Sequence, residues 1–364
     1  MRKTIIIGFV VMLSLVLVYG FSDAKVTGVC SNCHTMHLSQ GGTTDTFEGV
    51  TVAGPINALI KATSATNPCV ACHAGAAGAT DSATGAPQVD GTNGLAGGTF
   101  NTTTADTPAK VHNVSVLRTA DSTFTATTLS PPGFTASAPL PPAGLTTGPS
   151  TWTISTNQLT CAGTYGCHGK RDTTNPIKAI QGAHHGNTNI DNTSTAGTVA
   201  TSYRFLYGIK GAEVAGWQET DNAHNGYYGT DTQGESYQTI SYLCSECHGN
   251  FHWHIALGGT TEVGGTSPWL RHPTDIALAA STGGIFTTDY GTLGFAYNLE
   301  TPVAFESPVT TTTTFTTADA RVMCLSCHRA HGSAYTDILR FNYADIKAGQ
   351  AITTGCNRCH QRQR

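Results

Sequence analysis

Hydrophobic residues form a regular pattern in few places along the chain. One apolar run extends from Ile5 to Tyr19; elsewhere helical periodicity is weak, and short apolar pieces such as Tyr203–Tyr207 could be strands. Residues 129–150 are rich in proline, glycine and threonine, which is typical of an extended connector, and residues 310–317 are nearly all threonine, which favours a β-prone or loop-like surface tract. The pattern therefore predicts mostly irregular coil with few short helices and strands.

The N-terminal run has the layout of a secretory signal peptide. Arg2 and Lys3 precede it, and the small residues that end at Ala24 offer a cleavage site. An uncleaved anchor is the alternative, but about 15 apolar residues fall short of the roughly 20 that cross a bilayer. We therefore expect a signal peptide over residues 1–24 and one domain over 25–364. The expected location is extracellular or on the outer cell surface, with the periplasm as the alternative.

The composition indicates that hydrophobic side chains alone do not fill the interior of the protein. Only 39% of the 364 residues are hydrophobic and 12% are charged, against roughly 45–50% and about 25% in average soluble domains. Something other than side chains must therefore help to fill the core. The formal net charge of −4 gives no basic surface of the kind that binds phosphates, so nucleic acid is excluded as an expected partner.

The twelve cysteines form six pairs, and a histidine directly follows the second cysteine of every pair. Five pairs read C-x-x-C-H, which is the attachment signature of haem c, whereas the third has five residues between its cysteines. We number the motifs 1 to 6 in chain order: Cys30, Cys33 and His34; Cys69, Cys72 and His73; Cys161, Cys167 and His168; Cys244, Cys247 and His248; Cys324, Cys327 and His328; Cys356, Cys359 and His360. The pattern predicts six covalent haems whose irons are bound on one face by these motif histidines.

Two other interpretations use cysteine pairs. A zinc ribbon does not require a histidine after each second cysteine, and vicinal disulfides would leave the six histidines unexplained. For Cys161 and Cys167 a plain disulfide stays open because of the longer spacing. Gly163 and Gly166 favour haem attachment there, since glycine lets a longer loop fold back on itself.

Ligands for the opposite iron faces are also available. Methionine is disfavoured because beyond the signal peptide only Met36 and Met323 occur, each next to a motif, so all six haems can be bis-histidine, which implies low potentials. Nine further histidines remain for six irons. Of these, His254 is the most dispensable, and only one of the adjacent His184 and His185 is expected to bind. The predicted distal ligands are His37, His112, His185, His224, His252, His272 and His331.

Spacing suggests which iron some of these histidines reach. His37 and His331 follow a motif histidine by three residues, and His252 follows one by four. On a helical turn such pairs lie on the same side, so they cannot bind opposite faces of one iron. Each must then reach a neighbouring haem, which predicts a closely packed string of haems.

Several segments resemble one family across most of the predicted mature chain, in the same order. They are Cys30-Ser-Asn-Cys33-His34-Thr35-Met36-His37, Leu270-Arg271-His272-Pro273, Cys324-Leu-Ser-Cys327-His328-Arg329-Ala330-His331-Gly332 and Cys356-Asn-Arg-Cys359-His360. The chain resembles the filament-forming outer-membrane hexahaem c-type cytochromes, the extracellular cytochrome nanowires. This resemblance implies a homopolymer with a continuous line of haems, in which His37 binds the iron held by His328 in an adjoining protomer.

Three functions follow from the sequence. The first is a filament subunit that passes electrons to extracellular acceptors such as metal oxides. The second is a discrete periplasmic or outer-surface carrier, docked to other cytochromes or a porin–cytochrome conduit. The third, a multihaem reductase of a small molecule such as nitrite, is disfavoured because every motif ends in histidine and spare histidines are plentiful. We therefore expect an electron-transfer protein rather than an enzyme, with the fold class of a multihaem cytochrome c: irregular coil wrapped around packed haems.

Overall fold

The structure is a computed structural model. It describes residues 26, 28–37, 45–47, 50–52, 54, 56–75, 84–92, 96–101, 109–118, 131–132, 158–186, 197–214, 219–232, 236–251, 271–278, 295–311, 314–316, 318–347 and 355–359. The predicted signal peptide, most of the connector near 129–150, and the candidate ligands His252, His254 and His360 lie outside the described residues.

Helices are short wherever the chain is described. The α-helices are α2 (Val70–His73), α3 (Pro176–Ala179), α4 (Ile240–Ser245) and α5 (Cys324–Cys327). The 3₁₀ turns are η1 (Cys30–Asn32), η2 (Asn57–Leu59), η3 (Tyr203–Phe205), η4 (Ser236–Gln238), η5 (Gly249–Phe251), η8 (Thr336–Ile338), η9 (Tyr343–Asp345) and η10 (Gly355–Arg358). Within this described part, no helix has the length and apolar character needed to cross a membrane.

Local sequence explains where these helices begin. The five regular cysteine motifs each coincide with one short helical turn, in η1, α2, α4, α5 and η10. Two helices also have side-chain caps: Asn175 accepts two backbone N–H bonds at the start of α3, and Thr239 accepts one at the start of α4. Each helix ends within about a turn, so the chain returns to irregular backbone between motifs.

One mixed sheet organises the C-terminal half. Its strands follow the order β3 (Gly211–Ala212), β4 (Gly226–Tyr228), β7 (Ala304–Phe305), β9 (Ala320–Val322) and β5 (Ile276–Ala277). Only β4 and β7 run parallel, with Tyr227 opposite Ala304. Two further antiparallel pairs join β1 (Asp45–Phe47) to β2 (Val50–Val52), and β6 (Phe295–Ala296) to β8 (Thr314–Phe315).

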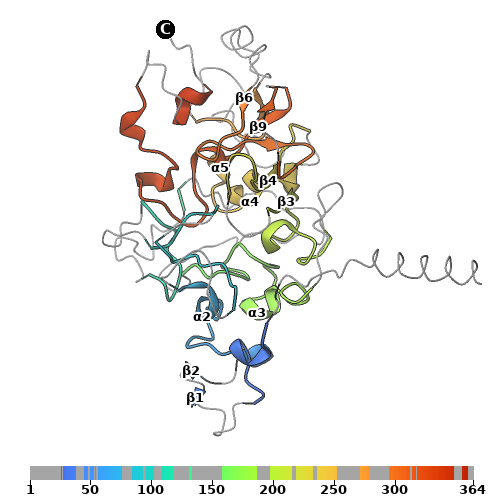
Figure 1. The fold of residues 1–364 in the computed structure, drawn as a ribbon, viewed down its shortest axis with the longest axis vertical. Coiled ribbons are helices and arrows are strands. Elements are labelled where there is room, and N and C mark those ends of the chain that lie inside the picture. The colour runs from blue at the N-terminus through green and yellow to red at the C-terminus, as the bar shows by residue number, and fades with distance from the viewer. Residues whose placement is uncertain are drawn as a thin grey trace, which may run out of the picture.

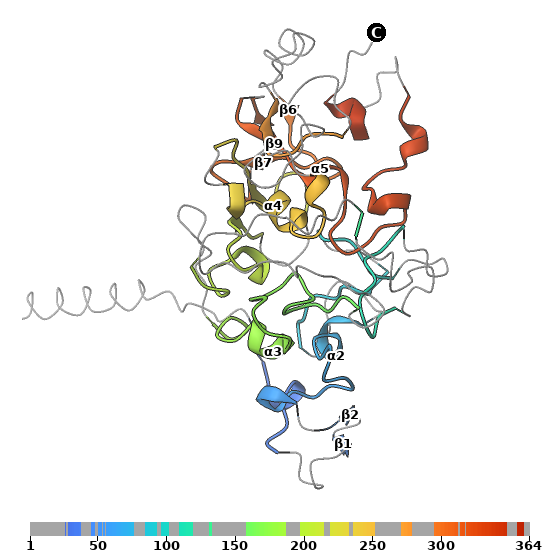
Figure 2. The same ribbon diagram turned by 180° about the vertical axis from the view of Figure 1, so that it is seen from behind.

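The largest apolar core lies beside this sheet. It joins residues of β4 and β7 to residues of α4 and α5: Tyr203, Leu206, Ile209, Tyr227, Ile240, Leu243, Ala304, Met323 and Leu325. The β1–β2 pair and motif 1 lie at one end of the long axis, α2 and α3 come next, and the sheet with α4 and α5 occupies the other half (Figure 1). The view from behind gives the same order (Figure 2). The motifs therefore follow one another along the molecule.

The predicted secondary structure is confirmed in its main feature, because the described chain is mostly irregular with few short elements. The apolar piece Tyr203–Tyr207, for which the sequence left a strand open, does not form one. Tyr203–Phe205 forms the turn η3, in which Arg204 and Phe205 have φ values of 49° and 60°. A left-handed backbone cannot pair in a sheet, so the apolar side chains there do not make a strand. The threonine tract forms the short surface strand β8 in part.

Candidate haem sites

Each regular motif closes on one backbone hydrogen bond. The N–H of the motif histidine donates to the carbonyl of the first cysteine in motifs 1, 2, 4 and 5, over 2.9 to 3.1 Å. In motif 6 the N–H of Cys359 donates to Cys356 over 3.1 Å. This bond folds the two cysteines and the histidine onto a single turn, which is the arrangement that two thioethers to one porphyrin edge and one imidazole to its iron require.

Motif 3 closes in the same way despite its longer loop. The N–H of His168 donates to the carbonyl of Cys161 over 3.0 Å, so the additional residues form a loop that does not separate the ends of the motif. Gly163 has φ of +89°, and a Cβ atom at Gly166 would lie 2.5 Å from the backbone nitrogen of Ala162. Both glycines are needed for the loop to fold back. All twelve cysteines are free thiols in the structure, so Cys161 and Cys167 are not joined to each other.

Every described motif histidine is oriented by a backbone carbonyl. Its Nδ1 lies 2.7 to 2.9 Å from a carbonyl oxygen, in the pairs His34 with Ala58, His73 with Pro87, His168 with Arg204, His248 with Pro132 and His328 with Asp337. A carbonyl can only accept a hydrogen bond, so the proton resides on Nδ1 and the lone pair on Nε2. Metal-binding histidines adopt this tautomer when Nε2 is the ligand atom.

Four motif histidines face a second histidine from elsewhere in the chain. The ring centroids are 5.9 Å apart for His34 and His185, 6.1 Å for His73 and His184, 6.3 Å for His248 and His112, and 6.5 Å for His168 and His331. Two imidazoles that bind one iron from opposite faces, each at a metal–nitrogen distance of about 2 Å, place their ring centres about 6 Å apart. The four spacings fit an iron between each pair.

The adjacent His184 and His185 lie beside two different motifs, whereas the sequence analysis expected only one of them to bind. His185 faces His34 of motif 1, and His184 faces His73 of motif 2. The two side chains diverge because the chain turns sharply between Gly182 and Gly186, and the rings end 5.9 Å apart at an interplanar angle of 82°. Two neighbouring residues are therefore brought to two different motifs.

The other candidate ligands lie in contrasting surroundings. His224 is fully buried, its Nδ1 lies 2.8 Å from the carbonyl of Asn225, and its ring stacks on Tyr297 at 3.4 Å. His272 is exposed, with Nδ1 2.8 Å from the carbonyl of Pro273. His37 is exposed and makes no polar contact with another described residue. The structure does not place these three rings relative to His360, which lies outside the described residues.

Burial keeps three of the facing imidazoles neutral. It lowers the pKa of His331 to about 3 and the pKa of His112 and of His184 to about 4, and nearby histidines add to the effect. Burial also raises the pKa of the Cys247 and Cys327 thiols to about 12. Neutral imidazoles suit iron ligation, and protonated thiols are poor ligands for a thiolate metal site. No cluster of three or more metal-binding side chains is found among the described residues.

Consecutive motifs touch through their cysteines. The thiols of Cys69 and Cys161 hydrogen-bond to each other, and this bond is the main cause that raises the pKa of Cys69. The thiols of Cys244 and Cys324 also hydrogen-bond to each other, and this bond is the main cause that raises the pKa of Cys244. These contacts join motif 2 to motif 3 and motif 4 to motif 5. Because thioethers form at one edge of a porphyrin, haems held by these cysteines would have their edges close together.

A buried ion pair joins motif 3 to motif 4, and the sequence analysis missed it. Arg171 contacts Glu246, and their side chains are only 6% and 9% exposed. Arg171 follows His168 by three residues, and Glu246 lies between the two cysteines of motif 4. Burial raises the pKa of Glu246 to about 7, and Arg171 opposes this rise. The only signal in the sequence was a carboxylate inside a motif, which does not identify its partner.

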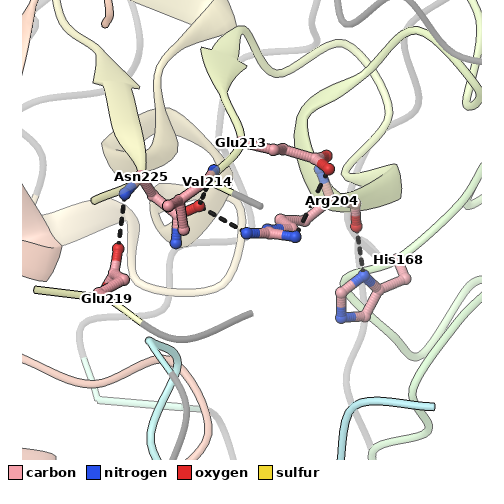
Figure 3. Close-up of polar contacts among 6 residues, drawn as sticks. All are labelled: His168, Arg204, Glu213, Val214, Glu219 and Asn225. Atoms are coloured by element: carbon pink, nitrogen blue, oxygen red, sulfur yellow. Dashed lines mark hydrogen bonds and ion pairs between the residues drawn. The ribbon is translucent and has the colours of Figure 1, made fainter. Parts of the chain in front are cut away.

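A polar network extends from His168 into the sheet (Figure 3). The carbonyl of Arg204 accepts the bond from His168, while its backbone N–H donates to Glu213 over 2.7 Å and its guanidinium donates to Asn225 over 2.6 Å. The backbone N–H of Asn225 in turn donates to Glu219 over 2.8 Å. Since the Asn225 carbonyl is also the partner of His224, two candidate ligands are oriented by one connected set of residues.

Comparison with known proteins adds a family match and two structural neighbours. Residues 317–364, which contain motifs 5 and 6, match the family described as doubled CXXCH motif. No curated protein matches significantly. The chain is similar to the outer membrane cytochrome S filament from Geobacter sulfurreducens, with 20% identity and a TM-score of 0.46, covering 88% of this chain and 85% of that chain. The OmcS nanowires from the same organism give 19% identity and the same TM-score and coverage.

Proposed function

We propose that the chain transfers electrons through six covalently bound haems c, one at each motif. The observation that carries this proposal is the set of four histidine pairs whose ring centroids lie 5.9 to 6.5 Å apart. Haem supplies a one-electron couple when bound, and axial ligands from both sides leave the iron no open position for a substrate. The arrangement suits electron transfer and does not suit catalysis at these four sites.

The pairs support one further axial ligand for each of four motifs. His185 serves motif 1, His184 serves motif 2, His331 serves motif 3 and His112 serves motif 4. His184 thereby joins the distal ligands predicted from the sequence. The cysteines of motif 3, Cys161 and Cys167, bind a haem like the others, which is supported by the backbone closure that this motif shares with the regular ones.

The order of the motifs supports a linear path for electrons. The adjacent residues His184 and His185 link motif 1 to motif 2. Thiol contacts link motif 2 to motif 3 and motif 4 to motif 5. The Arg171–Glu246 pair links motif 3 to motif 4. Cys356 and Cys359 of motif 6 lie close enough to Cys327 of motif 5 to add to the rise that burial causes in the pKa of its thiol. The haems then follow one another in sequence order from one end of the molecule to the other.

We further propose that the path continues between copies of this chain in a filament. His37 is exposed at the end of the molecule that holds motif 1, next to Met36, which is 86% exposed. His328 of motif 5 is exposed, and among the described residues no histidine ring faces it. His37 offers an imidazole at one end of the molecule, and the motif 5 site in the other half lacks a facing histidine. We therefore propose that His37 of one copy completes the motif 5 site of the next.

A substitution at His37 tests the filament. His37→Ala is expected to load six haems, to remain monomeric in sizing experiments, and to bind carbon monoxide at one reduced haem. Met36→Ala is the matched control, because it changes a neighbouring exposed side chain that cannot bind iron in the same way; it should still form fibres visible by electron microscopy. Normal fibres of His37→Ala would refute the intersubunit role and leave the discrete carrier.

The proposed setting is the outer cell surface, with extracellular acceptors such as metal oxides and with other cytochromes or a porin conduit as electron donors. Export rests on the signal peptide predicted over residues 1–24. Sequencing the N-terminus of the secreted protein tests it, and a mature chain that begins at Lys25 is expected.

A further inference from the structure

Three motif histidines contact the same unusual backbone feature. The carbonyls that accept from His34, His168 and His328 belong to Ala58, Arg204 and Asp337. Each of these residues begins a pair with positive φ: Ala58 and Leu59 at 62° and 57°, Arg204 and Phe205 at 49° and 60°, Asp337 and Ile338 at 59° and 56°. They account for six of the eight non-glycine residues with positive φ in the described chain. We call residues 57–60, 203–206 and 336–339 the left-handed turns.

The second residue of each left-handed turn makes a second, equivalent contact. Its carbonyl accepts the backbone N–H of the residue that directly follows the motif histidine. The three bonds are Thr35 to Leu59 over 2.8 Å, Gly169 to Phe205 over 2.7 Å and Arg329 to Ile338 over 2.8 Å. Two successive carbonyls thus hold one imidazole and the peptide bond beside it.

This geometry explains why the backbone is left-handed. Successive carbonyls point to opposite sides in an extended chain and to the same side in a helical one. A left-handed pair directs both carbonyls at the motif while the chain enters and leaves in extended conformation, as at Ile56 and Ile60. Non-glycine residues adopt such pairs only under strain, and strain of this kind is typical of functional sites.

The left-handed turns occur at alternate motifs. Motifs 1, 3 and 5 have them, whereas His73 and His248 of motifs 2 and 4 are oriented by single carbonyls, those of Pro87 and Pro132. The three turns follow their motifs at very different distances along the chain, and each nevertheless reproduces the same two contacts. A local sequence effect therefore does not account for them.

We propose that the left-handed turns are positioning elements that fix the imidazole orientation and strengthen the iron–histidine bond at motifs 1, 3 and 5. The inference rests on the proposed haem ligation. A hydrogen bond to Nδ1 makes an imidazole more basic and so favours the oxidised iron. All five described motif histidines have this bond, and the turns add a second carbonyl that holds the peptide beside the imidazole at motifs 1, 3 and 5. Removing a turn should therefore loosen the imidazole and raise the reduction potential of that haem.

Ala58 offers the sharpest test because its side chain is exposed and its carbonyl makes the contact. Ala58→Pro cannot adopt positive φ and removes the turn. Ala58→Gly is the matched control, since glycine adopts positive φ without strain. We expect Ala58→Pro to keep six haems, as measured by intact mass, and to alter one low-spin EPR signal. One reduction potential should rise by about 59 mV, which corresponds to a tenfold change in the ratio of oxidised to reduced haem. Ala58→Gly should leave both unchanged.

Asp337 provides an independent second site, also on an exposed turn. Asp337→Pro and Asp337→Gly should reproduce the contrast at a different haem. If the proline and glycine variants at both sites give the same potentials and EPR signals, the turns do not position the ligands and the inference is overturned. A wild-type protein whose mass contains no haem would instead refute the proposed function, so the two failures are distinguishable.

Discussion

The imidazole of His331 lies 6.5 Å from that of His168, so a residue that follows motif 5 faces the histidine of motif 3. The same segment supports motif 4, because the carbonyl of Ala330 lies 2.7 Å from Nδ1 of His112, and the N–H of His112 donates to the carbonyl of His331 over 3.0 Å. Four residues, 328 to 331, therefore contribute to three candidate sites. Changes in this segment should affect several haems at once.

Removing His331 should open one iron. His331→Ala is expected to keep all six haems covalently attached while one reduced haem gains carbon monoxide binding, because the motif 3 iron loses its second axial ligand. His331→Met should instead restore a closed site at a higher potential. Carbon monoxide difference spectra check this, with His254→Ala as a control that should bind none. Absence of carbon monoxide binding in His331→Ala would assign the motif 3 iron to another ligand.

Motif 3 should carry a haem of its own. Replacing both Cys161 and Cys167 with alanine removes both thioethers, so the intact mass should fall by one haem relative to the wild type. Replacing both cysteines of motif 2, Cys69 and Cys72, should produce an equal loss and serves as the comparison. An unchanged haem content in the motif 3 variant would mean that its cysteines do not attach haem.

The Arg171–Glu246 pair should be important for stability. Arg171→Met leaves a buried carboxylate without its partner, which typically lowers the free energy of unfolding by about 3–5 kcal/mol. Replacing both residues with Met and Leu should recover most of this loss, because no charge then remains buried. Denaturant unfolding of the holoprotein measures the effect. As a comparison, Glu306→Gln changes a half-exposed partner of Arg321. This substitution should lower the free energy of unfolding by less than about 1 kcal/mol.

Acid should destabilise the fold at a defined pH. Without iron, burial lowers the pKa of His112 and of His184 to about 4 in the folded chain, and iron ligation would also require the neutral imidazole, whereas an exposed histidine titrates near about 6.5. Between these values the unfolded chain binds more protons, so stability is present above about 6.5 and is lost as the pH falls toward 4. Unfolding curves from pH 7 to 4 should follow this course. Constant stability across the window would contradict it.

The sequence predicted the features that depend on local spacing. Six cysteine pairs with their histidines predict attachment points because a single turn can bring the three side chains together, and the closing hydrogen bond is present in motif 3 as well. The scarcity of regular structure was also predictable, since the chain lacks periodic hydrophobic residues. These inferences needed no knowledge of distant contacts.

Features that depend on distant contacts were not predictable. Adjacency suggested that His184 and His185 compete for one iron, yet a sharp turn sends their rings to different motifs. Phe205 looked like part of an apolar strand, and instead its left-handed backbone holds motif 3. In both cases tertiary contacts override local preference, and no periodic pattern records them.

The hydrogen bond from His168 to the carbonyl of Cys161 has a consequence beyond this chain. Because of this bond, the ends of the motif stay close together even though more residues lie between the two cysteines. If motif 3 carries a haem as proposed, an attachment loop can gain residues as long as glycines such as Gly163 let the chain fold back on itself. Proteins scanned only for the two-residue spacing would be assigned too few redox centres, and apparent gaps in their electron-transfer paths would be filled by sites of this lengthened kind.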